Sequence, residues 1–500
     1  MLFNSSAFLI FFIAVFFIYH FVLGKIGFRG AMPQIIFLTL ASFVFYSYER
    51  PSLLILLLLS LAVNSLATKA IIVYRHQDLK DKARLVALLA VAFNLAVLAT
   101  FKYAALIIGT FFNIGPGDSL LQTVKDIPLP IGISFYTFQG ISLLVDVYTA
   151  DKTGQIISGD DKMERHFSSE LLSFSTKIAF FISFFPQLIA GPILKAKQFM
   201  PQVGAKTIRD IQWDIAVKYL ILGFFLKNVV ADNLKEVTNQ ITHPAIVERM
   251  PVIDLIAVVY GYSLQIFADF NGYSLIAMGL AALLGYRIPI NFNFPYIATS
   301  ITEFWQRWHI SLSSWLREYL YIPLGGNRKG RVRTYINLFI VMFLGGLWHG
   351  AAWSFALWGS AHGLFLAIER LFRGRGQKTA TKRSPTHPLN LLRLFLVFNL
   401  VSWTWLLFAI PDFDGIIGYV HHLFSNPVGL TPITLFTVGL FGFPVLVYHI
   451  WGLACHNNQE LRERQKEGKF QLIEGAIYSL LLFFVITNSG APGDFIYFQF

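Results

Sequence analysis

Two histidines lie in stretches that are otherwise apolar enough to sit inside a bilayer. His349 belongs to the run Leu344–Trp353, and His309 belongs to Trp305–Trp315. An ionisable side chain at membrane depth is costly and generally faces a cavity or a partner, so each is a candidate for function. The unperturbed pKa of imidazole lies nearest to neutrality, which suits it to proton transfer. The pair therefore predicts proton chemistry.

The segment that carries His309 is predicted to be one amphipathic helix. Ser300–Glu303 fits a capping box, so the helix should begin there. Spacings of three and four residues then place two stripes on it. The polar stripe is Thr302, Gln306, His309, Ser313 and Arg317, and the aromatic stripe is Trp305, Trp308, Leu312, Trp315 and Tyr319. Such a helix fits the wall of an aqueous funnel or an interfacial position.

This arrangement carries a geometric expectation. Proton transfer needs a reach of roughly 3 Å or one bridging water, so His309 and His349 should converge at the narrow point of the funnel. The polar stripe should line the funnel, with Trp305, Trp308 and Trp315 turned into protein or lipid.

Two further segments should depart from simple spans. Phe185–Pro192 holds two prolines and a glycine, which break helices and are tolerated at membrane depth where the backbone lines protein or a water-filled cavity. Asp269–Tyr273 is expected to interrupt the long apolar run Val252–Gly285. Gln265 and Asp269 share one helical face, where they either join helices or line a cavity.

The composition defines the class of protein that must position these residues. The chain is 55% hydrophobic with 50 phenylalanines among 500 residues, and its mean hydropathy is +0.58. A spanning helix needs roughly 20 apolar residues, and about fourteen stretches are candidates. We predict an all-α, polytopic helical membrane protein with about 11–13 spans plus re-entrant helices that form a central funnel.

The charge pattern predicts membrane topology rather than nucleic-acid binding. The formal net charge is +12, but the basic residues cluster in loops, which the positive-inside rule places in the cytoplasm. Lys25 and Arg29 after the first stretch put the N-terminus on the periplasmic side. Beyond Phe167 two interpretations stay open. Either Leu171–Leu194 is a re-entrant hairpin, or one of the charge clusters that flank it breaks the rule.

We predict one membrane domain over residues 1–500, with N-terminal spans (1–119), a catalytic core (120–370) and C-terminal spans (371–500). The polar stretch Arg370–Pro388 reads as a disordered cytoplasmic loop that divides the last two parts. One cysteine, Cys455, excludes a site with several thiolates. The histidine spacings lack the metalloprotease pattern, so no metal site is predicted.

Several motifs resemble the membrane-bound O-acyltransferase family, in its bacterial alginate O-acetyltransferase branch. The resemblance covers nearly the whole chain, and its strongest marks are Trp305–Gly330 and Gly345–Gly350. The remaining motifs follow in the order seen in that branch: Leu2–Leu9, Phe184–Pro192, Asp269–Ser274 and Asn291–Tyr296. His349 matches the near-invariant histidine of the family, and His309 matches its second polar position.

The resemblance implies an acetyltransferase in the bacterial cytoplasmic (inner) membrane. A cytoplasmic donor, acetyl-CoA or another acyl thioester, would supply acetyl groups for O-acetylation of an extracellular polysaccharide such as alginate or cellulose. The expected partners are membrane lipid, a periplasmic acetyltransferase that acts on the polymer, and the exopolysaccharide synthesis machinery. Relatives that transfer D-alanine toward teichoic acid from a carrier protein provide the alternative.

We assign His349 as the general base on the acceptor hydroxyl and His309 as the group that orients the acceptor or hydrogen-bonds the oxyanion. A covalent acyl-histidine is a further route. The residues expected to bind substrate are Gln306, Arg307, Trp308, Ser313, Asp269, Asn271, Tyr273 and Trp348. A transporter with a histidine relay is a rival interpretation, which the lack of internal repeats disfavours.

Overall fold

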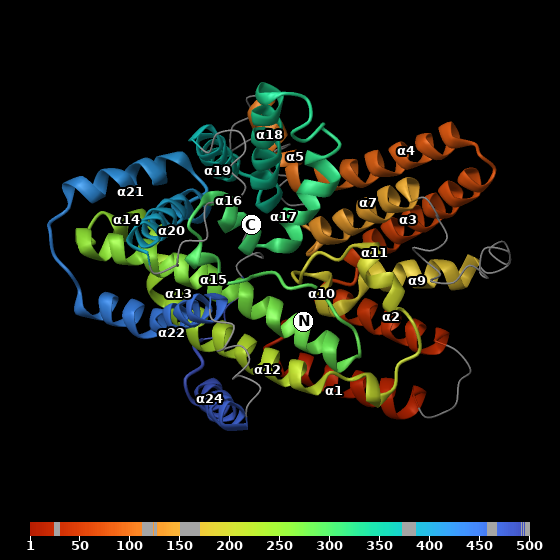
Figure 1. The fold of residues 1–500 in the computed structure, drawn as a ribbon, viewed down its shortest axis with the longest axis horizontal. Coiled ribbons are helices and arrows are strands. Elements are labelled where there is room, and N and C mark those ends of the chain that lie inside the picture. Colours follow the sequence, from red (N-terminus) through yellow and green to blue (C-terminus); the bar gives the residue numbers. More distant parts are fainter. Residues whose placement is uncertain are drawn as a thin grey trace. The chain divides into compact units, whose positions relative to one another are not determined.

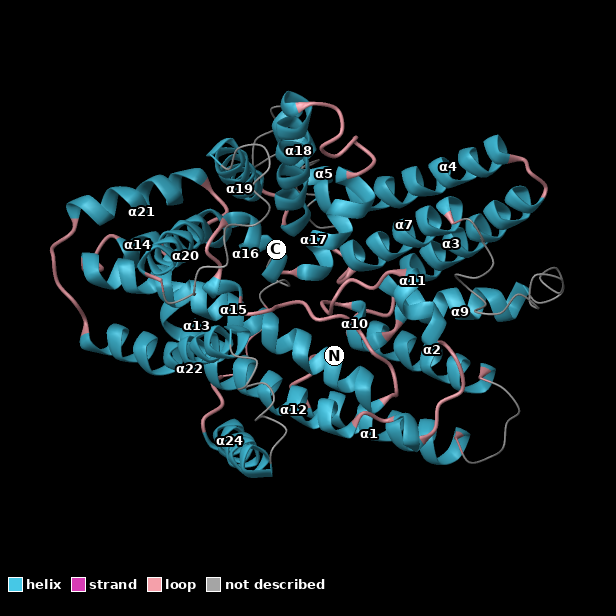
Figure 2. Cartoon of the chain, viewed as in Figure 1, coloured by secondary structure: helices cyan, strands magenta, loops and turns pink. Residues whose placement is uncertain are grey.

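The fold is helical throughout the part of the chain that the computed structural model describes (Figures 1 and 2). These residues are 1–24, 31–112, 124, 128–150, 171–372, 387–457, 468–491, 493 and 495. The predicted all-α class is confirmed. Lys25, Arg29 and most of the Arg370–Pro388 loop lie outside the described residues, and so does Asp151–His166, the charge cluster that precedes Leu171–Leu194. The predictions made on these residues stay predictions.

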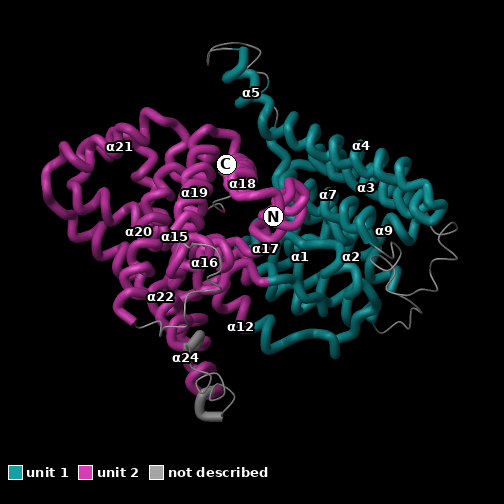
Figure 3. The backbone as a smooth tube through the Cα atoms, turned by 45° about the horizontal axis from the view of Figure 1, so that its top comes forward, with its two compact units in different colours: residues 1–217, 276–289 teal, residues 218–275, 290–500 magenta. Residues whose placement is uncertain are grey.

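The chain divides into two compact units, which Figure 3 colours separately. Unit 1 holds residues 1–217 and 276–289, and unit 2 holds residues 218–275 and 290–500. The longer helices of unit 1 are α1 (Ser6–Phe17), α2 (Met32–Ser47), α3 (Leu53–His76), α4 (Lys80–Leu98), α5 (Ala104–Phe111), α7 (Ile133–Thr149) and α9 (Leu171–Ser183). Its short elements are η1 (Ile18–Leu23), η2 (Ala99–Tyr103), α10 (Phe185–Leu188), α11 (Ala196–Phe199), η4 (Met200–Gln202) and η5 (Ile208–Asp210).

Two helices belong partly to unit 1 and partly to unit 2: α12 (Trp213–Phe224) and α15 (Val252–Leu283). The longer helices of unit 2 are α18 (Arg331–His349), α19 (Trp353–Phe372), α20 (Pro388–Ala409), α21 (Phe413–Ser425), α22 (Pro432–Asn457) and α24 (Gly468–Thr487). Its short elements are η6 (Phe225–Ala231), α13 (Asp232–Thr238), η7 (Asn239–Thr242), α14 (Pro244–Val247), η8 (Pro295–Ile297), α16 (Ile301–Arg307), α17 (Ile310–Leu316) and η9 (Arg317–Tyr321).

Among the residues that the structure describes, six helices are long and apolar enough to cross a membrane. They are Ser6–Leu23, Leu53–His76, Lys80–Phe111, Val252–Leu283, Pro388–Ala409 and Pro432–Ala454, and three shorter apolar helices accompany them. Large apolar side chains on these helices face outward; Ile10, for example, is 70% exposed. Outward apolar faces suit contact with lipid, so the protein is a multi-pass membrane protein. The expected total of about 11–13 spans stays a prediction.

The core of unit 1 contains a bundle of α3, α4 and α7. Asn64 on α3 and Asn94 on α4 exchange amide hydrogen bonds of 3.2 and 3.1 Å between them. Buried amide pairs of this kind hold helices together where lipid provides no hydrophobic driving force.

The helix break predicted in Phe185–Pro192 is confirmed in the same unit. Helix α9 ends at Ser183, and α10 has Pro186 in its first turn.

Helix α15 contradicts one expectation. The motif Asp269–Tyr273 was expected to interrupt the apolar run, but the helix continues through it from Val252 to Leu283. The charged Asp269 is tolerated there because Lys227 lies 2.9 Å away, so the helix need not open to hydrate it.

Glycines bring α18 and α19 together in unit 2. A Cβ on Gly346 would lie 2.2 Å from the carbonyl oxygen of Phe355 and 3.0 Å from the Cα of Gly359. Small residues allow such close backbone approach between membrane helices. The contact fixes the end of α18, where His349 is the last helical residue.

Candidate active site

His309 lies at a sharp break between two short helices. Helix α16 ends at Arg307, α17 begins at Ile310, and His309 itself has φ 42° and ψ 54°. The single helix predicted through His309 is therefore wrong. A non-glycine residue in the left-handed region is uncommon, and such positions cluster at functional sites.

The start of α16 follows the predicted capping box only in part. The Ser300 hydroxyl accepts a hydrogen bond from the Glu303 N–H, as expected. The Glu303 carboxylate, however, accepts from the N–H of Thr299 at 2.8 Å and binds Arg307 at 2.9 Å. Burial opposes ionisation of Glu303, but the Thr299 hydrogen bonds and the Arg307 charge outweigh it, so the pKa of this carboxyl lies below its ordinary value.

Asn291 sets the orientation of the His309 ring. The Asn291 Oδ1 accepts from the Ser311 N–H at 3.3 Å and the Ser311 hydroxyl at 2.7 Å, and it lies 3.1 Å from His309 Nδ1. A backbone N–H can only donate, so the shared atom must be the amide oxygen, and Nδ1 must carry a hydrogen. In the neutral ring Nε2 then bears the lone pair and can accept a hydrogen bond from a hydroxyl group.

His349 lies in an aromatic enclosure at the C-terminal end of α18. Its ring centroid is 5.3 Å from that of Trp358 and 5.2 Å from that of Phe408, and both rings meet it edge to face. The side chain is buried, with 4% exposed. The C-terminal end of a helix carries partial negative charge, which stabilises an imidazolium formed by proton uptake.

The two imidazoles converge, as the geometric prediction required. The ring centroids of His309 and His349 lie 6.3 Å apart, and Trp348 packs 5.8 Å from His309 and 5.1 Å from His349. At this separation both rings can act on one hydroxyl or acyl group, either directly or through one water.

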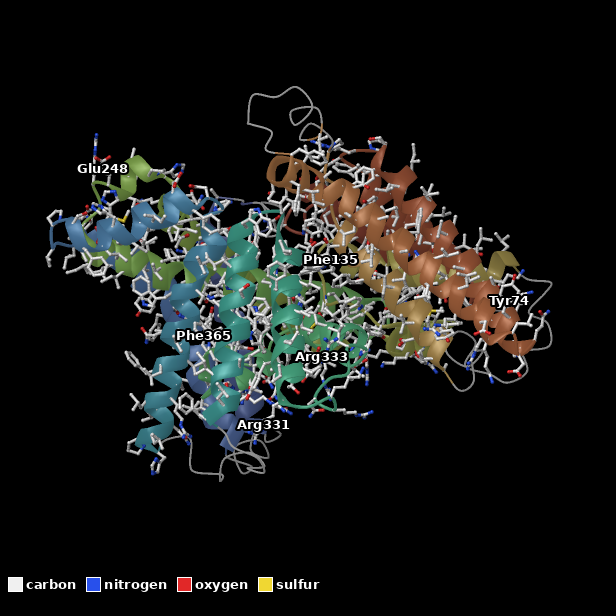
Figure 4. The ribbon with its side chains drawn as sticks, turned by 90° about the horizontal axis from the view of Figure 1, so that it is seen from above. Tyr74, Phe135, Glu248, Arg331, Arg333 and Phe365 are labelled. Carbon is white, nitrogen blue, oxygen red and sulfur yellow. The ribbon has the colours of Figure 1, made fainter. Side chains whose placement is uncertain are left out.

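A cavity of about 870 Å³ lies beside these helices in unit 2. Its walls include the cationic side chains of Arg317, Arg331 and Arg370 together with the carboxylate of Glu369. Figure 4 labels Arg331 at the first turn of α18. Glu369 accepts from the Thr302 N–H at 3.0 Å and so caps the start of α16. The excess of positive charge suits an anionic ligand.

The funnel prediction is right for part of the polar stripe. Thr302, Gln306 and Ser313 line the cavity. His309 and His349 are buried and do not line it, so their place at the narrow point of a funnel stays a prediction. Trp305 also lines the cavity, although it was expected to turn away from it. The break explains the position of His309, because the helical spacing does not continue across it. Trp305 precedes the break on α16, where it lies three residues after Thr302 and therefore on the same side of the helix.

Other predicted substrate contacts have protein partners. Arg307 binds Glu303 and donates to the Asn293 carbonyl at 3.0 Å. Trp308 is buried and stacks on Phe304 at 5.5 Å. These contacts stabilise the turn around His309.

Three further predicted contacts lie along one short stretch of α15. Asp269 pairs with Lys227, Asn271 is buried, and Tyr273 packs on Phe495 at 4.5 Å. Substrate contact by these residues, and by Arg307 and Trp308, stays a prediction.

Sequence reasoning missed two residues. Asn291 orients His309, and only its place in the Asn291–Tyr296 motif indicated it. Lys227 lies in the apolar run Ile215–Val230. A charge within an apolar run is itself a functional signal, so Lys227 was recognisable by the criterion that selected the histidines.

Comparison with known families decides the class of the protein. The model of the MBOAT, membrane-bound O-acyltransferase family matches residues 125–415, more than half of the chain. The chain belongs to this family. As a membrane-bound O-acyltransferase it is an enzyme that uses an acyl donor, and the matched range contains both His309 and His349.

Individual relatives of this membrane-bound O-acyltransferase act on different polymers. The probable alginate O-acetylase AlgI of Pseudomonas aeruginosa is 34% identical over 93% of this chain and 84% of its own length. A peptidoglycan O-acetyltransferase of Helicobacter pylori is 34% identical over 87% of this chain and 81% of its own. A teichoic acid D-alanyltransferase of Streptococcus thermophilus is 28% identical over 56% of this chain and 68% of its own.

Proposed function

We propose that this enzyme moves acetyl groups from a cytoplasmic thioester across the bacterial inner membrane for O-acetylation of an extracellular polysaccharide, alginate-like or cellulose. The observation that carries the proposal is the pair of buried imidazoles whose centroids lie 6.3 Å apart. Similarity to an alginate O-acetylase over most of the chain supports acetyl as the group and a polysaccharide as the acceptor.

In the proposed mechanism His349 takes the proton from the acceptor hydroxyl as the new C–O bond forms at the thioester carbonyl. The C–S bond then breaks, and the leaving thiolate takes up the proton from His349 and departs as a thiol. General-base catalysis of this kind contributes about 10² to 10⁴ in rate. The reacting hydroxyl gives its one hydrogen to His349, so His309 presents the Nε2 lone pair to a second hydroxyl of the acceptor and orients the acceptor in this way. The tautomer set by Asn291 supports this role over donation to an oxyanion, for which the ring would need a second proton.

The cavity is the proposed donor site. Acetyl-CoA and carrier-bound thioesters both carry phosphate groups, and Arg317, Arg331 and Arg370 supply matching cations. In this assignment the loop before α18, which contains Asn327 and Gly330, borders the entrance for the donor. No metal is needed for the chemistry, because the imidazoles perform the proton transfers.

The proposed setting follows from the loop charges and the relatives. The N-terminus lies on the periplasmic side, and the basic loops face the cytoplasm. A periplasmic acetyltransferase completes the transfer to polymer, next to the exopolysaccharide synthesis machinery. Fusion of a periplasm-dependent reporter to the N-terminus tests the orientation, and activity only with a cytoplasm-dependent reporter would contradict it.

D-alanyl transfer toward teichoic acid is a second candidate. Similarity to a D-alanyltransferase over 56% of this chain supports it. The rival histidine-relay transporter predicts substrate flux without consumption of an acyl donor.

The test uses purified protein in lipid nanodiscs with labelled acetyl-CoA or a D-alanyl carrier thioester and a glycan acceptor. We expect acetyl ester formation that His349→Ala lowers by about 10² to 10⁴ and that His421→Ala, on the exposed side of α21, leaves unchanged. Transfer of D-alanine alone would establish the second candidate. Retained acetyl transfer in His349→Ala would overturn the proposed mechanism.

A further inference from the structure

A buried ionic cluster joins α15 to the segment that precedes it in unit 2. The Lys227 ammonium lies 2.6 Å from Asp232 Oδ1 and 2.9 Å from Asp269 Oδ1. All three side chains are buried, none with more than 6% exposed. Desolvation of buried ion pairs costs a large free energy, so such pairs are weak evidence for added stability. The cluster is therefore a candidate for positioning other groups.

The backbone permits this cluster because Gly272 lacks a side chain. A Cβ at Gly272 would lie 2.8 Å from the backbone nitrogen of Lys227 and 2.8 Å from the carbonyl oxygen of Gly223. The Asp269–Tyr273 motif therefore brings η6 against α15, with Asp269 placed to bind Lys227.

The same lysine holds the C-terminal segment, defined here as residues 488–491, 493 and 495. Lys227 Nζ donates to the Gly493 carbonyl at 3.1 Å. Two more hydrogen bonds tie the segment to this region. The Gly490 N–H donates to the Asn228 carbonyl at 2.8 Å, and the Asn233 side chain donates to the Asn488 carbonyl at 3.1 Å.

Phe495 of this segment reaches the aromatic surroundings of His309. Its ring centroid lies 4.5 Å from that of Tyr273 and 5.8 Å from that of Phe270. The Phe270 ring in turn meets the His309 ring edge to face at 4.6 Å. Three contacts thus connect Lys227 to a proposed active-site imidazole by way of Gly493, Phe495 and Phe270.

We propose that Lys227 and Phe495 are positioning residues for acyl transfer. The Lys227–Asp232–Asp269 cluster anchors the C-terminal segment so that Phe495 backs Phe270 and holds it against His309. The anchored segment also keeps water from this side of the imidazole, which limits hydrolysis of the thioester. This inference rests on the proposed role of His309.

The anchoring is tested by cysteine labelling. Cys455 is the single cysteine, so Cys455→Ser with Phe495→Cys gives one thiol whose reaction with a small maleimide reports release of the segment. We expect Lys227→Met to raise the labelling rate at least about tenfold, since local opening exposes the site. The matched control is Lys218→Met, which removes a 3.0 Å ion pair with the partly exposed Glu474. Equal labelling rates in the Lys227→Met and control proteins would overturn the anchoring.

The link to catalysis is tested separately, because Lys227→Met leaves two buried carboxylates and can impair folding. In the native background, Phe495→Ala should lower kcat about tenfold with the donor KM unchanged, while Phe495→Tyr retains most activity. An unchanged kcat in Phe495→Ala would overturn the positioning role. The labelling result does not depend on acyl transfer, so failure of the proposed function and failure of this inference are distinguishable.

Discussion

The Oδ1 atom of Asn291 lies 3.1 Å from Nδ1 of His309 and also accepts two hydrogen bonds from Ser311. This contact decides which nitrogen of the ring carries the hydrogen and which one bears the lone pair. The hydrogen-bond partner of one ring nitrogen fixes the state of the other nitrogen. Under the proposed mechanism Asn291 is therefore a positioning residue that acts through His309.

Asn291→Ala should therefore reduce acyl transfer about tenfold to a hundredfold, because the ring loses the acceptor that fixes its tautomer. Asn291→Asp keeps an acceptor oxygen and should retain more activity. The control is Asn293→Ala in the same motif, where the side chain is exposed. Rates from single-turnover assays check the order. Equal activity of the Asn291→Ala and Asn293→Ala proteins would remove the tautomer argument.

His349→Ala should lower kcat by about 10² to 10⁴ if the ring is the general base. His349→Gln should be as impaired, since an amide fills much of the space but cannot take the proton. Both proteins should accumulate in the membrane at normal levels. A search for acyl-protein after rapid quench, by mass spectrometry, separates the routes: a stable adduct on His349 would establish covalent catalysis in place of base catalysis.

The helical class, and the choice of the two histidines as candidate site residues, followed from local information. Hydropathy locates long helices, and an imidazole inside an apolar run is conspicuous at any position. The break at His309 was not predictable in this way, because Asn291 stabilises it from another segment. The partnership of Lys227 with Asp269 likewise depends on helix packing, and so does the absence of a break in α15. Long-range pairs decide these features, and periodicity carries no signal of them.

The stability of the enzyme should depend on pH through Glu303. A carboxyl whose pKa is lowered in the folded state adds stability above its unfolded pKa and loses that contribution as pH falls through the folded value. Native protein should thus melt at a higher temperature than Glu303→Gln at neutral pH. The difference should shrink in the acid range, below the ordinary pKa of glutamate. Melting curves of detergent-solubilised protein check this, and a difference that grows on acidification would contradict the assignment.

Gly346→Ala should destabilise the α18–α19 pair, because its Cβ would lie 2.2 Å from the Phe355 carbonyl oxygen. Overpacking against backbone costs about 1–3 kcal/mol. Gly418→Ala on α21 is the control, since no atom lies within 4 Å of its Cβ. We expect a lower melting temperature for the Gly346→Ala protein alone, with activity reduced because the end of α18 carries His349. Equal melting temperatures would show that the helices separate at no cost.

Arg331 and Arg333 offer a matched test of the donor site. Both are exposed on the first turn of α18 (Figure 4), but only Arg331 lines the cavity. Arg331→Gln should raise the donor KM about tenfold with little change in kcat, because it removes a contact made equally in the ground state and the transition state. Arg333→Gln should leave both constants near the native values.

The two substitutions change the net charge equally, so long-range attraction would affect donor binding by both proteins alike. A difference in donor KM between them therefore points to direct contact. Raising the salt concentration should weaken donor binding by native protein more than by Arg331→Gln. If Arg333→Gln raised the donor KM as much as Arg331→Gln did, the cavity would not be the donor site.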